Sequence, residues 1–263
     1  MRQITDIKEC QAILLDIAKQ FVEICDRHNI TYYMLGGTLL GAVRHNGFIP
    51  WDDDMDFGVM REDFPNLLSF LGKELKYPYK LHTYRDTVNI LGQTVKIADE
   101  RTVTHELLQE GFTPMGINID IFPLDHAKSD GRRFDRPFVS NIIKQIYSYK
   151  YWSLHSRPFF KKLAAGLIKI CLCWMSKDMF VKLTTKLDKS KSGDFIANNS
   201  GAWGLKETMP KAIFETSHKY KFEDTEFNGV TDYDSYLSHL YGDYMQLPPE
   251  EKRHIHLSSM YWK

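Results

Sequence analysis

Four carboxylates crowd five consecutive positions of this 263-residue sequence; they belong to Asp52, Asp53, Asp54 and Asp56. Like charges this close repel one another unless something neutralises them. In an extended strand alternate residues share a face, so Asp52, Asp54 and Asp56 would lie on one side. Carboxylates two residues apart can hold a hard cation such as Mg²⁺ through their oxygens. A solvated acidic turn is the alternative, but the apolar run at residues 57–60 favours a strand that enters a core.

A pair of glycines, Gly36 and Gly37, lies about fifteen residues before the aspartates. It separates a β-branched and aromatic run at residues 31–35, which predicts a strand, from a short helix that Thr38 is expected to cap. Glycines let the backbone approach an anion, and the N–H groups at the start of a helix face that anion. A tight turn is the alternative for the glycines alone. Followed by a D-x-D strand, they predict that phosphate and metal bind together.

Asp120 offers a third carboxylate, inside the apolar run at residues 117–122. A charge buried in a strand needs a partner. That partner is either a lysine or arginine, which would make Asp120 structural, or a metal ion or an attacking hydroxyl whose proton it accepts. Because the other two motifs are present, we favour the functional interpretation.

Two basic residues are weaker candidates for binding the substrate. Arg44 follows the short helix after the glycines; it either reaches a phosphate or stabilises the carboxyl end of that helix. Lys96 lies in an alternating strand at residues 93–97 and either touches phosphate or points to solvent. We therefore expect substrate contacts from five residues: Gly36, Gly37, Thr38, Arg44 and Lys96.

Hydrophobic spacing predicts the elements that must position these residues. Steps of three and four residues indicate an amphipathic helix over residues 5–27. Further helices are expected at residues 38–44, 62–75 and 233–240, and strands at residues 31–35, 54–60, 81–84, 90–98, 117–122 and 220–222. Interleaved strands and helices predict an α/β or α+β fold with helices packed on one sheet. We expect the α+β form, a mixed sheet flanked by helices.

Three segments differ in character: a catalytic core at residues 1–125, a basic, aromatic-rich helical segment at 126–192, and a C-terminal portion at 193–263 that packs on the core. The formal net charge is zero, from 34 basic and 34 acidic residues, which argues against a dedicated nucleic-acid binder. Residues 128–191 nevertheless carry 11 Lys and 4 Arg against 4 Asp and no Glu, a net charge of +11. This charge suits an anionic membrane or a polyanionic acceptor, or belongs to a helical cap on the core.

No stretch of the sequence reaches the ~18–20 apolar residues that span a bilayer, and the first residues lack the continuous apolar run of a signal peptide. The four cysteines match neither a zinc site nor an ordinary disulfide pair, as expected of free thiols in a reducing compartment. We therefore expect a cytoplasmic protein, with peripheral contact to an anionic membrane as a further expectation.

The block at residues 36–56, GGTLLGAVRHNGFIPWDDDMD, resembles the signature of the LicD family. Residues 119–125 and 241–249 also resemble motifs of that family, whose best-known members are choline-phosphate transferases and whose distant relatives are fukutin-related proteins. The resemblance implies a nucleotidyltransferase-like fold. It matches Gly36 and Gly37 to the family's Gly-Gly turn, and the aspartates to its carboxylates: Asp54 and Asp56 to the metal-binding D-x-D, Asp120 to the third carboxylate, and Asp52 to a supporting or second-metal role.

This resemblance implies a metal-dependent transferase that uses Mg²⁺ or Mn²⁺, with Asp54, Asp56 and Asp120 as catalytic residues. The expected reaction moves a phospho-alcohol, first of all phosphocholine from CDP-choline or else the group of another CDP-alcohol, to a sugar hydroxyl. The expected acceptor is a cell-surface or lipid-linked glycan such as lipopolysaccharide, teichoic acid or capsule. The alternatives are a nucleotidyltransferase that releases pyrophosphate and a non-catalytic protein that binds glycan or membrane.

Overall fold

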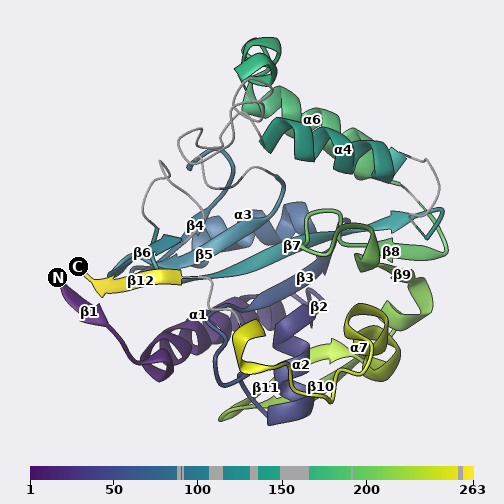
Figure 1. Ribbon diagram of the computed structural model, residues 1–263. Coiled ribbons are helices and arrows are strands. Elements are labelled where there is room, and N and C mark those ends of the chain that lie inside the picture. The colour runs from purple at the N-terminus through teal and green to yellow at the C-terminus, as the bar shows by residue number, and fades with distance from the viewer. Residues whose placement is uncertain are drawn as a thin grey trace.

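A seven-stranded mixed sheet forms the centre of the computed structural model (Figure 1). The structure describes residues 1–87, 90, 92–106, 115–130, 136–148, 166–190, 192–253 and 257–263. The strand order is β2–β3–β7–β5–β4, and β8 and β9 extend the sheet from β7. Their bounds are β2 (Tyr32–Met34), β3 (Asp56–Met60), β4 (Tyr79–His82), β5 (Val95–Asp99), β7 (Asn118–Ala127), β8 (Phe195–Ala197) and β9 (Thr208–Pro210). Strands β3 and β7 are parallel, whereas the other neighbouring pairs of this sheet are antiparallel.

Two smaller sheets complete the β-structure. The first joins both ends of the chain, which lie side by side in Figure 1, and consists of β1 (Arg2–Ile4), β12 (Leu257–Trp262) and β6 (Thr102–Glu106). The second is the hairpin of β10 (Ser217–Phe222) and β11 (Thr225–Val230).

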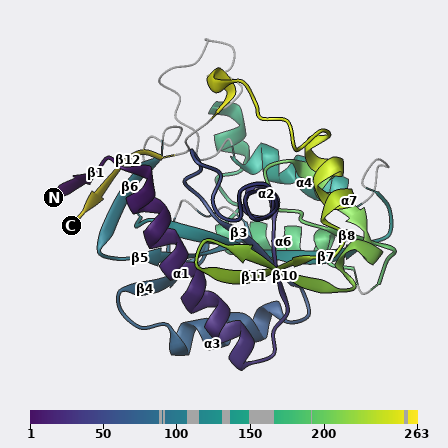
Figure 2. The same cartoon turned by 90° about the horizontal axis from the view of Figure 1, so that it is seen from below.

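Helices cover both faces of the central sheet. In Figure 1, α4 and α6 lie above the sheet and α1 and α2 below it; seen from below in Figure 2, α1 and the β10–β11 hairpin cross in front of the strands. The α-helices are α1 (Ile7–Arg27), α2 (Gly36–His45), α3 (Phe64–Glu74), α4 (Arg136–Ser148), α6 (Lys177–Asp188) and α7 (Tyr233–Tyr241), and the 3₁₀-helices are η1 (Gly204–Glu207), η2 (Lys211–Phe214) and η3 (Glu250–Lys252). In the described ranges, no helix is both long and apolar enough to cross a bilayer.

The expected α+β fold, a mixed sheet flanked by helices, is confirmed. Helices α1, α2, α3 and α7 and strands β2, β3, β4, β5, β7 and β10 overlap the ranges that the hydrophobic pattern predicts, although β4 lies two residues earlier and β7 continues five residues further than expected. One local prediction is wrong: Thr38 does not cap α2, which begins at Gly36 with Leu35 as its N-cap. The division at residues 125 and 192 stays a prediction; β8, from the third segment, pairs with β7.

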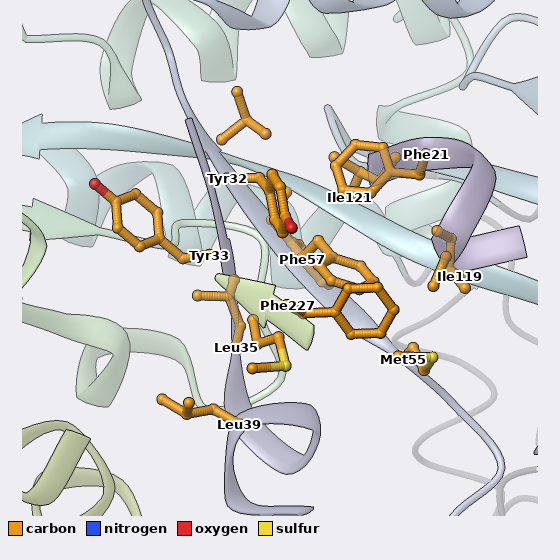
Figure 3. Packing of buried hydrophobic residues seen from close by; sticks show 14 of the residues in the cluster. Phe21, Tyr32, Tyr33, Leu35, Leu39, Met55, Phe57, Ile119, Ile121 and Phe227 are labelled. Carbon is orange, nitrogen blue, oxygen red and sulfur yellow. The ribbon is translucent and has the colours of Figure 1, made fainter. Parts of the chain in front are cut away.

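Aromatic side chains from four elements form the centre of the core (Figure 3). Phe57 of β3 packs against Phe21 of α1, with ring centroids 5.1 Å apart, and against Phe227 of β11 at 5.8 Å. Gly58 follows on the opposite face, where a Cβ atom would lie 2.8 Å from Leu124 and 2.9 Å from Leu35. Glycine thus lets the side chains of Leu35 and Leu124 pack directly against β3, and the strand is packed on both faces.

A buried ion pair closes the far end of the parallel pair. Arg61 follows β3 directly, and its Nε and Nη2 donate to the two carboxylate oxygens of Asp125 at 2.7 and 2.8 Å. The Asp125 side chain is 1% exposed. A carboxylate buried this deeply depends on its cation, because the loss of the partner leaves an uncompensated charge.

We predict that Arg61→Met lowers the free energy of unfolding by about 3–5 kcal/mol, because it leaves the Asp125 carboxylate buried without its cation. Urea unfolding followed by circular dichroism measures this change. The matched control is Arg85→Met, which removes an exposed partner of Asp178 and should cost less than about 1 kcal/mol. Equal destabilisation by the two substitutions would contradict the role assigned to the buried pair.

Candidate active site

A cavity of about 470 Å³ opens where α2 begins and where β3, β5 and β7 carry their polar side chains. Residues of α4, η1 and α7 form its other walls. The cavity collects most of the residues that the sequence singles out: Gly36, Gly37, Asp54, Asp56, Lys96 and Asp120. Asp52, Thr38 and Arg44 are not among its lining residues. The motifs that are dispersed along the sequence therefore meet at one place.

The two strand carboxylates stand side by side. Asp56 is the register partner of Asp120 in the parallel pairing of β3 and β7. In-register residues of neighbouring strands point to the same face of a sheet, so both side chains reach the cavity. The Asp120 N–H also donates to the Met55 carbonyl oxygen at 2.9 Å, which continues the pairing beyond the end of β3.

Side chains of the acidic run at residues 52–56 are alternately buried in the core and half-buried near the cavity, as expected of an extended segment. Asp53 and Met55 are 2% and 0% exposed, whereas Asp52, Asp54 and Asp56 are half-buried. The Gln11 side chain of α1 anchors this segment, because its Nε2 donates to the carbonyl oxygen of Asp52 at 2.9 Å. Asp52 lies over the start of α2: one of its carboxylate oxygens is 3.0 Å from where a Cβ atom on Gly37 would sit.

The two glycines form the first turn of α2. Gly36 has a φ of +47°, a conformation that strongly favours glycine, and its N–H donates to the Tyr236 hydroxyl at 3.0 Å. A Cβ atom on Gly36 would lie 3.4 Å from the Tyr241 hydroxyl. The buried Thr38 hydroxyl accepts from the Asp56 N–H at 2.8 Å, so Thr38 holds the start of β3. Substrate contacts of these residues stay predictions.

Arg44 lies at the other end of the helix. Its Nη1 donates to the Tyr244 carbonyl oxygen at 2.7 Å, and its Nε donates to His45 at 3.0 Å. This places Arg44 in the last turn of α2, as in the alternative interpretation, in which it stabilises the carboxyl end of the helix. Its predicted contact with substrate is not tested by this arrangement.

Lys96 points into the cavity and pairs with Asp120. The two residues are register partners in the antiparallel pairing of β5 and β7, and Nζ lies 2.7 Å from Oδ1 of Asp120. Nζ also donates to the Asn118 side chain at 3.1 Å. Asp120 thus has the basic partner that a buried charge requires, while its position beside Asp56 keeps it within the cavity.

The electrostatics of the cavity favour a cation. Burial, followed by the carboxylates of Asp54 and Asp120, raises the pKa of Asp56 well above its ordinary value, and Lys96 opposes this shift. Among the described residues, no three histidine, cysteine, aspartate or glutamate side chains converge as a preformed metal site. Mg²⁺ is usually held by one or two carboxylates together with phosphate and water oxygens. Asp54 and Asp56 fit that mode of binding.

Three lining residues were missed by the sequence analysis as individual candidates: Trp203, Glu207 and Tyr241. Glu207 accepts from the Trp203 N–H at 2.9 Å and from the Asn198 side chain at 2.6 Å, and burial raises its pKa to about 6. Burial and the charge of Asp56 raise the pKa of Tyr241, so its hydroxyl is a hydrogen-bond donor at neutral pH. Tyr241 begins a stretch that resembles a family motif, whereas no local pattern marks Trp203 or Glu207.

Comparison with known proteins identifies the family. Residues 29–160 match the LicD/FKTN/FKRP nucleotidyltransferase domain. The chain is 30% identical to the lipopolysaccharide cholinephosphotransferase LicD of Haemophilus influenzae over 97% of both chains. It is 38% identical to the human ribitol 5-phosphate transferase FKRP over 65 residues, which are 25% of this chain and 13% of the relative. The chain therefore belongs to the LicD family and is a LicD-type phosphotransferase.

Proposed function

We propose that the protein transfers a phospho-alcohol from a CDP-alcohol, first of all phosphocholine from CDP-choline, to a hydroxyl group of a cell-surface glycan. Lipopolysaccharide is the first acceptor to test, with teichoic acid and capsule as others. The similarity to a lipopolysaccharide cholinephosphotransferase over 97% of both chains supports this class of reaction. The observation that carries the proposal is the in-register pair of Asp56 and Asp120 in the cavity beside the glycines of α2.

The proposed metal is Mg²⁺, or Mn²⁺ in its place, held by Asp54 and Asp56 together with oxygens of the donor diphosphate. When bound, the ion neutralises charge on the diphosphate and on the departing CMP. Asp52 supports this site from its position beside Gly37, in the first turn of α2. Asp120 lies beside Asp56 as a third oxygen donor, and its ion pair with Lys96 orients it. The carboxylates that repel one another without a cation would thereby become a stable set.

Asp120 is the proposed base. The acceptor hydroxyl oxygen forms a bond to the phosphorus that carries the choline, the bond from that phosphorus to the CMP oxygen breaks, and the hydroxyl proton passes to the Asp120 carboxylate. Its ion pair with Lys96, at 2.7 Å, holds this carboxylate in the cavity. The Tyr241 hydroxyl, close to Gly36, donates to a phosphate oxygen of the donor.

The acceptor can approach from a second cavity of about 550 Å³. Lys144, Ser148 and residues 200–202 line both cavities, so the two spaces adjoin. The lining of the second cavity includes Asn141, Gln145 and Asn199, whose amide groups suit the hydroxyls of a sugar. We place the acceptor glycan along this route.

The basic segment supports a further proposal, peripheral contact with an anionic membrane. Its described part exposes large apolar side chains in a set that belongs to α4, α6 and residues 166–175: Ile142, Ile146, Leu167, Ile170, Trp174, Met179 and Leu183. Trp174 is 64% and Ile170 is 70% exposed. Apolar side chains amid a net charge of +11 match a surface that lies in the interface of an anionic bilayer. Lys161 and Lys162, which belong to the same expected helix, lie outside the described residues.

We predict that Asp56→Asn lowers the rate of CMP release from CDP-choline at least roughly a hundred-fold, because it removes charge that is needed only where the phosphoryl group transfers. Asp16→Asn, on the exposed side of α1, is the matched control and should keep full activity. Thermal unfolding should show that both variants are folded. Full turnover by Asp56→Asn would contradict the site, and pyrophosphate release from CTP by the wild type would favour the nucleotidyltransferase alternative.

A second prediction concerns the metal. Chelation by EDTA should abolish CMP release, and added Mg²⁺ or Mn²⁺ should restore it. Asp54→Ala should weaken Mn²⁺ binding, measured by calorimetry, roughly ten-fold or more while the protein stays folded, because it removes one of two carboxylate ligands. Activity that survives chelation, or unchanged Mn²⁺ affinity in Asp54→Ala, would exclude this assignment.

A third prediction concerns the membrane. The double substitution Ile170→Ser and Trp174→Ser should abolish most of the co-sedimentation with vesicles that contain phosphatidylserine, and Lys169→Glu should weaken it further, since each basic residue near the surface contributes about 1 kcal/mol. Met245→Ser, which changes an apolar side chain that is 57% exposed elsewhere, is the control. A wild-type protein that does not sediment with these vesicles would refute the proposal.

A further inference from the structure

Glu207 is a half-buried carboxylate without an ion-pair partner in the described part of the chain. It lines the cavity, and each of its oxygens accepts a hydrogen bond from a neutral donor: the Trp203 N–H at 2.9 Å and the Asn198 side chain at 2.6 Å. In the described ranges no lysine or arginine pairs with this carboxylate, and burial raises the pKa of Glu207 to about 6. Withdrawing a carboxylate from water without a cation is costly, so a half-buried, unpaired carboxylate on a cavity wall suits a cation that arrives with a ligand.

Two aromatic rings border the same part of the cavity. The rings of Trp203 and Tyr241 meet edge to face, with centroids 5.5 Å apart and an angle of 89° between their planes. Trp203 is 48% exposed, so its indole offers a large surface to the cavity. The hydrogen bond from its N–H to Glu207 fixes the backbone that carries it. Gly201 lets the carboxylate pack closely, because a Cβ atom there would collide with both carboxylate oxygens.

This combination attracts organic cations. The face of an aromatic ring is electronegative, and a nearby carboxylate adds a full charge of the same sign. The indole already attracts a cation: Nζ of Lys206, which does not line the cavity, lies 5.8 Å from the ring centroid. Quaternary ammonium groups are recognised by such aromatic walls, because they are large, weakly hydrated and unable to donate hydrogen bonds.

We propose that Trp203, Tyr241 and Glu207 form the subsite for the cationic head group of the donor alcohol, a quaternary ammonium such as that of choline. The inference rests on the proposed function, which supplies the CDP-alcohol. Tyr241 contacts both the proposed phosphate position and the proposed head-group subsite. Its hydroxyl lies beside Gly36, and its ring packs against Trp203. The subsite then selects a charged alcohol over a neutral polyol such as ribitol.

The test compares phosphocholine with the phosphate ester of its neutral tert-butyl analogue, in which carbon replaces the ammonium nitrogen. The wild-type protein should bind phosphocholine roughly ten-fold more tightly in calorimetry, because the shapes match and only the charge differs. In Trp203→Leu and in Glu207→Gln the two esters should bind with about equal affinity, while affinity for CMP stays unchanged. Tyr77→Leu, which changes an aromatic residue that is 80% exposed outside the cavity, should keep the preference.

Equal affinity of the wild type for the two esters, or a preference that survives in both variants, would overturn the subsite. Release of CMP from CDP-choline and CDP-ribitol separates this failure from that of the proposed function. Turnover of both donors at equal efficiency refutes the subsite and leaves phospho-alcohol transfer in place. A wild type that releases CMP from neither donor but prefers phosphocholine over the neutral ester refutes the transfer and supports the cation subsite.

Discussion

The active-site architecture depends on the in-register parallel pairing of β3 and β7, which sets Asp56 beside Asp120 on one face of the sheet. Two neighbouring carboxylates in a partly dry cavity repel each other, so the surroundings must supply positive charge. Part of it is built in, because Lys96 on the next strand pairs with Asp120. We propose that a bound ligand supplies the remaining positive charge. This requirement is the physical basis for the proposed cation at Asp54 and Asp56.

Such a pairing is costly to hold, and the rest of the fold stabilises it from several sides. Phe57 packs into the aromatic core on one face of β3, and Gly58 admits Leu124 on the other. At the opposite end of the two strands, the buried pair of Arg61 and Asp125 joins them. These contacts are remote from the chemistry, yet a slip of β3 by one residue against β7 would turn the Asp56 carboxylate away from the cavity and separate it from Asp120.

The sequence predicts what is encoded locally. Asp54, Asp56 and the glycines stand out because charge density and backbone freedom are visible in a short window, and the α+β fold follows from periodicity. The Lys96–Asp120 pair depends on the order of strands in the sheet, which no single segment determines. Strands β1 and β12 come from opposite ends of the chain, so no local pattern in the sequence predicts their pairing. Glu207 has no local mark, because what distinguishes it is its place on the cavity wall beside Trp203 and Tyr241, which only the folded chain brings together.

The residues proposed for phosphate chemistry and those proposed for alcohol selection come from different parts of the chain. The carboxylates, the glycines and Lys96 all lie within residues 29–160, which match the family's nucleotidyltransferase domain, whereas Trp203, Glu207 and Tyr241 lie beyond it. These three belong to η1, the turn before it and the end of α7, none of which is part of the central sheet. Substitutions there can alter the charge and shape offered to the alcohol without moving β3 against β7. The proposed arrangement would thus let the alcohol specificity change while the pairing of Asp56 with Asp120 stays the same.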